Sequence, residues 1–284
     1  MWGVGMTSTW DPSKSKEWDS QQPNSICMSR MSRDIKQLLE EERQGDLDIF
    51  VYPNDQNLTK MMALIIGPAE TPYNGGFFQF YIRVPPDYPI TPPRVRNLTT
   101  GDSSVRFGPN LYNDGKICLS ILGTFPGPSW TPIMNVGGVL KSIQSLMSSS
   151  ALRNEPSYET RSTKDPQVVD YDRLITHETI RVAVADSVRQ AIDGACTFPV
   201  KFREIMMRRF LRQKPMWVKT CEDNVHLDGA PMNCIYGMSR GTFKWGTVKK
   251  ELNDLEPKVL AALDRLEVAK ENGGKRVVKP AAIK

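Results

Sequence analysis

The sequence has no long hydrophobic run, and its apolar stretches fall short of the roughly 18 residues that a membrane-spanning helix needs. It also has no apolar amino-terminal segment of the kind that directs secretion. Its five cysteines, at positions 27, 118, 196, 221 and 234, form no CxxC pair and no even framework, which is typical of reduced thiols. We therefore expect a soluble protein of the cytoplasm, the nucleus or both, with no membrane partner.

The sequence also has little excess of one charge over the other. The 284 residues include 37 Lys and Arg against 32 Asp and Glu, which leaves a net charge of +5. Both signs are interspersed along the chain, so no basic stripe for a phosphate backbone is evident. The composition argues against nucleic acid as a partner.

Histidine is rarer still, with two residues, His177 and His226. His177 lies in an apolar helical segment, where we expect a hydrogen-bonded packing residue. Cys221, His226 and Cys234 offer three zinc ligands, but their spacing matches no zinc finger. We therefore predict no metal site.

Composition and hydrophobic periodicity divide the chain into four parts. Residues 1–25 are rich in Ser, Asp, Lys and Gln and predict a disordered tail without a packed core. Residues 26–158 carry the helix and strand patterns of one core, and residues 159–272 carry further helical patterns. Two glycines are expected to end the last helix, so residues 273–284 predict a basic, disordered tail.

The core pattern predicts an α+β fold. Apolar residues recur at helical spacing over residues 26–43, which indicates an amphipathic first helix. Another such pattern over residues 135–148 predicts a helix that packs across a sheet. The sheet is expected to be a four-stranded antiparallel meander, because four strand patterns follow one another and a glycine turn at residues 72–76 separates the second from the third. The predicted strands lie near residues 49–52, 61–66, 77–84 and 94–98.

Residues after the core predict an α-helical extension. Residues 174–188 are nearly apolar between charges, and an amphipathic stripe runs from Phe202 to Phe210. A further stripe ends at Leu266. In that last helix, Pro257 fits the first turn if Asp254 caps the amino terminus.

The strongest chemical signal lies between Phe107 and Leu122. Cys118 follows the turn at Gly115 and lies eight residues beyond Asn110. A thiol that exchanges acyl groups with other macromolecules must be exposed and partly anionic, and a position after a glycine turn suits that need. A buried core cysteine is the structural alternative.

This part of the chain, from about Met28 to Tyr158, resembles the catalytic core of the ubiquitin-conjugating enzymes. The resemblance rests on Pro109-Asn110, Cys118, Trp130-Thr131-Pro132 and the run Tyr88-Pro89-Ile90-Thr91-Pro92-Pro93. Beyond it, the run His177-Glu178-Thr179-Ile180-Arg181-Val182-Ala183-Val184 is similar to the extended carboxyl region of Z-type members. The resemblance implies the ubiquitin-conjugating fold with an α-helical carboxyl-terminal extension.

The resemblance implies an acyl carrier that acts on protein substrates. Cys118 would accept ubiquitin, or a ubiquitin-like modifier, as a thioester from an activating enzyme and pass it to a substrate lysine, usually with a ligase. The activating enzyme consumes the ATP, so this chain would need no cofactor. Exchange between two sulfurs is nearly neutral in free energy, so no strong base need adjoin Cys118.

The resemblance also assigns supporting residues. Asn110 would donate its amide to the oxyanion that forms when lysine attacks the thioester, and the alternative is that it orders its own loop. Pro109 precedes it, and Trp130 is an aromatic lid near the cysteine. Gly108 stands where the family usually has His, so we expect a loosely held flap around Asn110.

Two acids that many family members carry are absent. Their places are taken by Ser120, two residues after the cysteine, and by Ser149, at the end of the following helix. Neither hydroxyl is a base at neutral pH, and Ser149 also fits a helix terminus. Asp114 or Glu155 could substitute for the missing acids.

Partner docking is implied at two places. Arg30, Arg33 and Lys36 on the first helix match the docking site for the activating enzyme, with a solvated helix face as the alternative. Two hydrophobic loops match the place where ligases bind, with core-facing side chains as the alternative. Their residues are Ile90, Pro132 and Ile133.

Two other function classes fit parts of the sequence. A ubiquitin-binding adaptor of the same fold would explain the missing His and acids, but such adaptors typically lack the cysteine that is intact here. A cysteine peptidase needs a histidine beside its thiol, and only His177 and His226 are available. The sequence favours the ubiquitin-conjugating enzyme.

Overall fold

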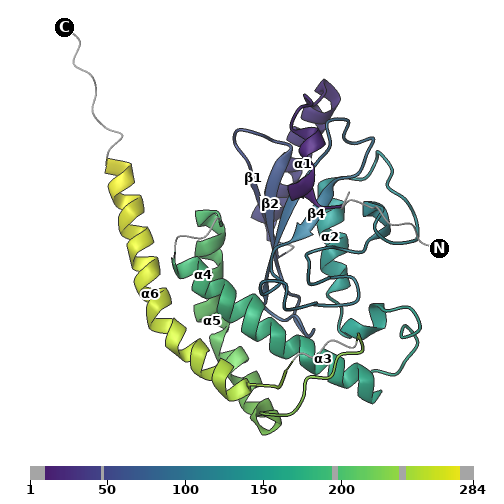
Figure 1. Ribbon diagram of the computed structural model, residues 1–284. Helices are drawn as coiled ribbons and strands as arrows, with labels where there is room; N and C mark the ends of the chain where they lie inside the picture. Colours follow the sequence, from purple (N-terminus) through teal and green to yellow (C-terminus); the bar gives the residue numbers. More distant parts are fainter. Residues whose placement is uncertain (1–9, 46–47, 194–197, 237–240, 276–284) are drawn as a thin grey trace. The chain divides into compact units, whose positions relative to one another are not determined.

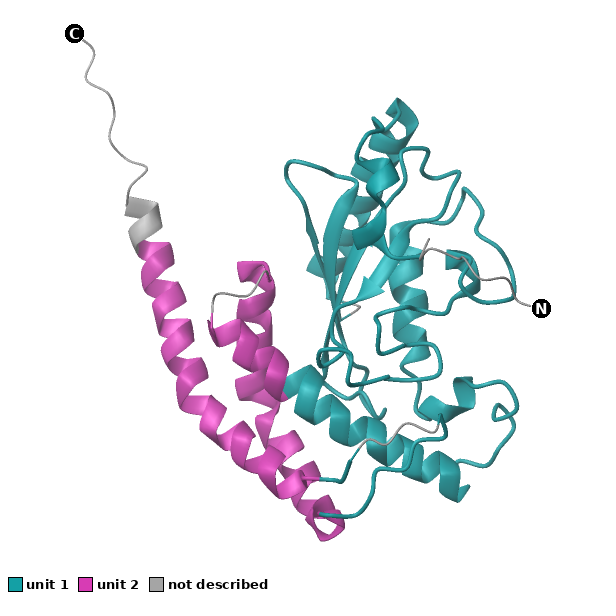
Figure 2. Cartoon of the chain, in the orientation of Figure 1, with its two compact units in different colours: residues 1–184, 229–243 teal, residues 185–228, 244–284 magenta. Residues whose placement is uncertain are grey.

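The structure, a computed structural model (Figure 1), describes residues 10–45, 48–193, 198–236 and 241–275. Cys196 and the predicted tail residues 1–9 and 276–284 lie outside the described residues. The chain forms two compact units (Figure 2).

Unit 1 consists of residues 1–184 and 229–243, and unit 2 consists of residues 185–228 and 244–284. Unit 1 is larger than the core expected at residues 26–158, because residues up to 184 and the segment 229–243 belong to the same compact body. The division expected at residue 158 is therefore not a boundary between compact units.

The centre of unit 1 is an antiparallel sheet whose strands pair in the order β1-β2-β3-β4. The pairing confirms the predicted meander, and each strand end lies within one residue of its predicted position. In the register, Phe80 lies opposite both Ala63 and Asn97. The strands are β1 (Ile49–Pro53), β2 (Lys60–Ile66), β3 (Phe77–Arg83) and β4 (Arg94–Asn97).

Two predicted core helices are confirmed as α1 (Ser25–Gln44) and α2 (Val136–Leu146). An asparagine caps each amino terminus: the Asn24 side chain accepts the Cys27 N–H at 2.8 Å, and Asn135 caps α2 in the same way. α1 packs against β1 and α2. Met31, Ile35 and Leu38 of its predicted apolar stripe are thereby buried, whereas Met28 is exposed and Leu39 is half-buried.

The prediction of a disordered tail is wrong for residues 10–25. Asp11 and Ser15 are fully buried, and a short 3-10 helix, Pro12–Lys14, lies against β3 and β4. Arg83 donates to the Ser15 carbonyl at 2.8 Å, and a second arginine of the sheet donates to Asp11 at 2.6 Å. Charge-assisted bonds to the sheet therefore order a segment that is too polar to build a core of its own.

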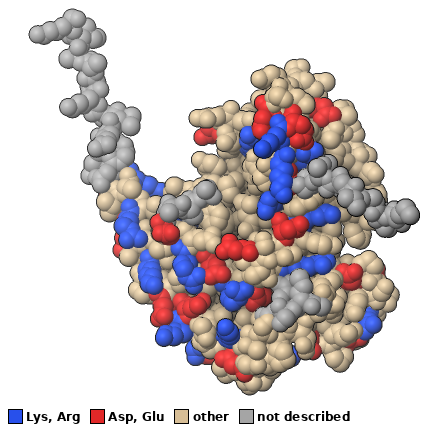
Figure 3. Space-filling model, viewed as in Figure 1, with Lys and Arg blue, Asp and Glu red and all other residues tan. Residues whose placement is uncertain are grey.

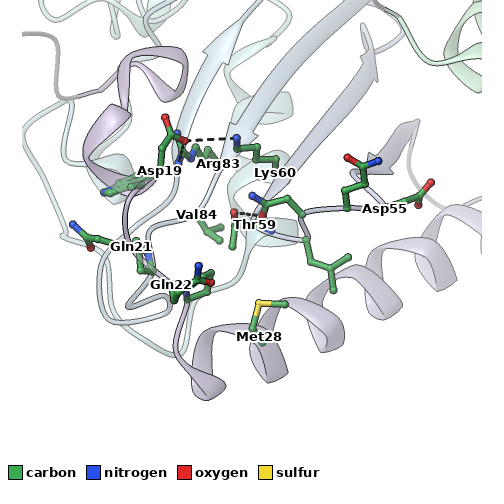
Figure 4. A pocket seen from close by; sticks show the side chains of 15 residues that line it. Asp19, Gln21, Gln22, Met28, Asp55, Thr59, Lys60, Arg83 and Val84 are labelled. Atoms are coloured by element: carbon green, nitrogen blue, oxygen red, sulfur yellow. Dashed lines mark hydrogen bonds and ion pairs between the residues drawn. The ribbon is translucent and has the colours of Figure 1, made fainter.

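The same segment borders a polar pocket of about 640 Å³ (Figure 4). Asp19 pairs there with Arg83 at 2.7 Å and with Lys60 at 3.8 Å. Gln21 and Gln22 line the pocket beside them, and Met28 of α1 lies at its edge. The lining residues include no cysteine or histidine, so the pocket offers no thiol or imidazole nucleophile.

Unit 1 continues into α3 (Pro166–Glu178) and a π-helical stretch, Thr179–Asp186, within which the unit boundary falls. His177 is buried, its Nδ1 lies 2.9 Å from Glu178, and its ring lies 5.4 Å from that of Phe243. The expectation of a hydrogen-bonded packing histidine is confirmed. Burial raises the pKa of Glu178, but bonds from His177 and Arg181 outweigh it and lower the pKa to about 2.

Unit 2 is helical, as predicted for the extension. It contains α4 (Ser187–Asp193), α5 (Val200–Asn224) and α6 (Trp245–Lys275), and α5 packs against both neighbours. Phe210 and Trp217 of α5 are buried with their rings 6.0 Å apart. Lys214 of α5 pairs with Glu256 of α6 at 2.5 Å, which adds an ion pair to the apolar contacts.

The start predicted for the last helix is wrong. α6 begins at Trp245, where the Asp228 carboxylate accepts the N–H groups of Trp245 and Gly246 at 2.5 and 3.0 Å. Pro257 is therefore inside the helix, and Asp254 is not its cap. α6 also continues through Gly273 to Lys275, past the end that the glycines predicted. The cap lies 17 residues upstream of Trp245, so local spacing gives no sign of it.

Charges are mixed on the face shown in Figure 3, where Lys and Arg side chains alternate with Asp and Glu. Within the described ranges, no helix is long and apolar enough to cross a membrane. Over the same residues, no three His, Cys, Asp or Glu side chains gather in the manner of a metal site.

Candidate functional site

Cys118 lies on the loop between β4 and α2, directly after an isolated bridge between Leu111 and Ile117. The turn between the bridged residues contains Gly115 at φ +91°, where a Cβ would approach the Asn97 carbonyl oxygen to 2.6 Å. Only glycine fits this turn. Cys118 itself is 6% exposed, so its thiol is more covered than the sequence predicted.

Asn110 and Cys118 bind each other through two hydrogen bonds. The Cys118 N–H donates to the Asn110 carbonyl at 2.9 Å, and the Asn110 Nδ2 donates to the Cys118 carbonyl at 3.0 Å. Asn110 is buried, and its Oδ1 has no hydrogen-bond partner. The amide thus orders the loop, which is the structural role that the sequence left open. Its nitrogen carries a second hydrogen that this bond does not use.

The flap before Asn110 is not loosely held, contrary to the expectation drawn from the missing histidine. Three successive carbonyls accept side-chain hydrogen bonds: Phe107 from the Tyr73 hydroxyl at 2.7 Å, Gly108 from Arg106 Nε at 3.1 Å, and Pro109 from Arg106 Nη2 at 2.7 Å. A Cβ at Gly108 would lie 3.0 Å from the Tyr73 hydroxyl oxygen. Tyr73 and Arg106 therefore supply the hydrogen bonds that a histidine at position 108 would make. The Tyr73 hydroxyl also leaves little room for a histidine ring there.

Arg106 is held between two aromatic rings. Its guanidinium carbon lies 3.9 Å from the ring centroid of Tyr112 and 3.7 Å from that of Tyr236. Stacking of this kind keeps the guanidinium plane in one orientation and adds cation–π attraction. Arg106 and Tyr112 lie in the loop of Asn110 and Cys118, whereas Tyr236 comes from the segment 229–243 of the same unit.

The charges around the thiol act in opposite directions. Burial raises the pKa of Cys118, while the positive charge of Lys116 and a hydrogen bond from the Tyr112 hydroxyl lower it by less. The charge of Arg106 also lowers this pKa, and that of Asp114 raises it. The net pKa of the thiol is raised, so the sulfur is mainly protonated at neutral pH.

A second hydroxyl holds the main chain on both sides of Cys118. The Thr124 Oγ1 donates to the Ile117 carbonyl at 2.6 Å and accepts the Leu119 N–H at 3.0 Å. Thr124 could not be selected from the sequence, because the turn of the loop determines its hydrogen-bond partners. Ser120, predicted as a supporting residue, begins the short 3-10 helix Ser120–Leu122 and is half-buried.

The remaining supporting residues have separate positions. Ser149 is exposed and lies two residues beyond Met147, the C-cap of α2, so it is past the helix terminus that was expected there. The Trp130 indole N–H donates to the Pro89 carbonyl at 2.8 Å, so it joins the two proline-containing loops. Of the two candidate acids, Asp114 accepts the Lys116 N–H at 3.0 Å, and Glu155 accepts the Tyr236 hydroxyl at 2.6 Å.

The residues predicted to bind a ligase are at the surface. Ile90 is 66% exposed and Ile133 is 86% exposed, and Pro132 is exposed beside it. The alternative of core-facing isoleucines is therefore wrong. Exposed isoleucines on neighbouring, proline-stiffened loops suit a small apolar contact.

Arg30 differs from the other residues of its predicted docking set. Its guanidinium donates to Asp34 at 2.8 Å, to the Pro132 carbonyl at 2.8 Å and to the Met134 carbonyl at 2.5 Å. Arg30 thus supports the loop that carries Ile133 instead of standing free on a solvated face. Arg33 and Lys36 are exposed on α1, and their docking role stays a prediction.

Comparison with known proteins agrees with this geometry. Residues 30–167 match the family described as ubiquitin-conjugating enzyme. The chain is 43% identical over 262 residues to ubiquitin-conjugating enzyme E2 Z of Homo sapiens, covering 92% of this chain and 72% of that protein. With ubiquitin-conjugating enzyme E2 Z of Xenopus tropicalis it is 42% identical over 254 residues, covering 89% and 78%. It is also 39% identical over 184 residues to the dual E2 ubiquitin-conjugating enzyme/E3 ubiquitin-protein ligase BIRC6 of Homo sapiens, covering 62% of this chain and 4% of that protein.

The raised pKa of Cys118 predicts how its alkylation depends on pH. Only the thiolate attacks iodoacetamide, so the rate should keep rising from pH 7 to pH 9 without a plateau. Tyr112→Phe removes a hydrogen bond to the thiolate and should slow alkylation at pH 8 further. Mass spectrometry of the Cys118 peptide measures both rates.

Tyr52→Phe serves as the control, because Tyr52 is an exposed tyrosine of β1. It should leave the pH profile unchanged. A plateau below pH 8 in the wild type would contradict the raised pKa, and unchanged alkylation in Tyr112→Phe would contradict the hydrogen bond.

Proposed function

Since this chain belongs to the ubiquitin-conjugating enzyme family, as a Z-type member, we propose that Cys118 is the sulfur that carries ubiquitin as a thioester. Enzymes of this family take ubiquitin from an activating enzyme and transfer it to lysine. The observation that carries the assignment is the pair of hydrogen bonds between Asn110 and the main chain of Cys118, which fixes the residue that bears the thiol against the residue that bears the amide. A non-catalytic adaptor is not favoured, because the relatives are named as enzymes and Cys118 is intact.

The proposed chemistry has two transfers. The Cys118 thiolate attacks the thioester carbonyl on the activating enzyme, a new C–S bond forms, and the donor sulfur leaves as a thiolate. A neutral lysine amine then attacks the Cys118 thioester, a C–N bond forms, the C–S bond breaks with the Cys118 sulfur leaving as a thiolate, and the proton lost by the nitrogen passes to that sulfur or to solvent. A thiol with a raised pKa is a slower leaving group, so the setting of Cys118 favours a thioester that lasts until a substrate arrives.

Charging with ubiquitin tests the assignment directly. Incubation with activating enzyme, ubiquitin and ATP should give a product that reductant removes on a gel. Cys118→Ser should give at most an ester that resists reductant, because oxygen replaces sulfur in the acyl bond. Cys234→Ser is the control, since Cys234 is a half-buried free cysteine in the segment 229–243.

The control should charge like the wild type. A wild-type chain that charges with no activating enzyme would favour the adaptor. Loss of charging in Cys234→Ser but not in Cys118→Ser would move the carrier to Cys234.

We propose two roles for Asn110. It orders the loop through the Cys118 carbonyl, and the unused N–H of its amide stabilises the oxyanion during lysine attack. Ser120 and Ser149 are not bases in this scheme. The acid that we place near the incoming lysine is Asp114, whose carboxylate is exposed on the same loop.

Asn110→Ala separates the two roles. Loss of the ordering bond should lower the melting temperature and reduce charging a few-fold. Loss of the oxyanion donor should slow discharge of the charged enzyme onto free lysine by a further factor of about 100. Single-turnover discharge measures this second step alone.

Asn113→Ala is the matched control, because Asn113 is another amide of the same loop and donates to the Ser103 carbonyl at 2.9 Å. It should discharge at the wild-type rate. Wild-type discharge by Asn110→Ala would remove the oxyanion role, and an unchanged melting temperature would remove the ordering role.

We propose that the activating enzyme docks on Arg33 and Lys36 of α1, and that ligases contact Ile90, Pro132 and Ile133. Reversal of both charges to Glu should slow charging most at low salt, because attraction to an acidic partner is screened by ions. Initial charging rates over a salt series measure this effect. Arg43→Glu, at the other end of α1, is the control and should charge normally. If the variant with both charges reversed charges as fast as the wild type at low salt, Arg33 and Lys36 do not dock the activating enzyme and this face of α1 is only solvated.

We propose that the chain needs no cofactor of its own, because acyl exchange between sulfur atoms uses no electrons and the activating enzyme consumes the ATP. Protein substrates supply the accepting lysine. We also propose the cytoplasm, the nucleus or both as its place of action, because a carrier thiol works only where cysteines stay reduced.

A further inference from the structure

We propose that Tyr236 is a positioning residue for the catalytic loop, acting through Arg106 on Asn110 and Cys118. Tyr236 belongs to the return segment, residues 229–243, which follows α5 in the sequence and is part of unit 1. The inference rests on the proposed role of Cys118. It makes the active site a composite of the core and a segment from the carboxyl-terminal part of the chain.

The return segment is closed at its base. Gly229 donates to the Phe243 carbonyl at 3.0 Å, Phe243 donates to the Ala230 carbonyl at 3.0 Å, and Met232 donates to the Gly241 carbonyl at 2.9 Å. The Phe243 ring packs edge-on against buried His177. These contacts hold both ends of the segment on unit 1, so Tyr236 projects from an anchored loop.

Tyr236 contacts three side chains outside the return segment. Its ring faces the Arg106 guanidinium at 3.7 Å and meets the edge of Tyr171 of α3 at 6.2 Å. Its hydroxyl donates to Glu155 at 2.6 Å, between residues 81 apart in the sequence. Burial raises the pKa of Tyr236, so the hydroxyl keeps its proton and remains a donor.

Arg106 passes this restraint to the catalytic loop. Tyr112 and Tyr236 cover its two faces, which leaves its edge to donate to the carbonyls of Gly108 and Pro109. Removal of the Tyr236 ring would expose one face to water and free the guanidinium to rotate. The flap that carries Asn110 would then lose its fixed donors, and the thiolate of Cys118 would lose part of a nearby positive charge.

The test compares three side chains at position 236. Tyr236→Phe keeps the ring and loses the bond to Glu155, whereas Tyr236→Leu keeps apolar volume without a π face. Tyr158→Ala is the control, because Tyr158 makes a stack of the same kind with Arg161 at 4.5 Å. Each variant is measured for single-turnover discharge onto free lysine, for the pH profile of Cys118 alkylation and for melting temperature.

Tyr236→Leu should slow discharge on the order of tenfold and move the alkylation profile to higher pH, because donors and charge are misplaced. Tyr236→Phe should have a discharge rate and an alkylation profile close to those of the wild type. Tyr158→Ala should also match the wild type in these two measurements. A merely structural role would lower the melting temperature but leave the pH profile of the folded enzyme unmoved.

A double variant tests the route through Arg106. In an Arg106→Gln background, Tyr236→Leu should add little to either defect, since its target is already gone. Additive defects would overturn the route, and wild-type discharge with a wild-type profile in Tyr236→Leu would overturn the proposal. Failure of the wild type to charge on Cys118 would instead contradict the proposed function, so the two failures are distinguishable.

Discussion

The loop that carries Asn110 and Cys118 depends on the guanidinium of Arg106. A loop of this kind exposes main-chain carbonyls that no helix or strand satisfies, and it must still hold an amide and a thiol at fixed positions. Arg106 does both, because its planar guanidinium donates to two successive carbonyls while two tyrosine rings fix its orientation. A lysine ammonium at this position could neither donate in this paired geometry nor stack in a fixed plane.

The same physical device recurs at the other end of the catalytic core. Arg30 donates to the loop carbonyls at Pro132 and Met134, and the buried Asp34 carboxylate holds Arg30 and the Tyr88 hydroxyl together. The exposed Ile133 therefore lies on a loop that this polar network supports. At these two loops, arginine side chains thus donate the hydrogen bonds that regular secondary structure would otherwise supply.

The fold was predictable where local patterns decide it. β3 and β4 carry period-two apolar patterns and α1 carries a period-3.6 pattern, whereas β1 and β2 are short, mostly apolar runs; burial of these apolar residues stabilises all five elements. Prediction failed at residues 10–25 and at the start of α6, because both depend on side chains that are distant in sequence. Asp11 needs the arginines of the sheet, and the first turn of α6 needs Asp228.

For the site, the reactive groups were predictable, because Cys118 and Asn110 belong to a motif whose residue types and spacing are local. The way in which they are held became evident only from the folded chain. The rigid flap in place of the expected loose one, the covered thiol, and the stack of Tyr236 on Arg106 all depend on contacts between separate parts of the chain. A one-dimensional pattern does not encode which distant ring or hydroxyl will meet a given loop, because that choice is made by packing of the whole unit.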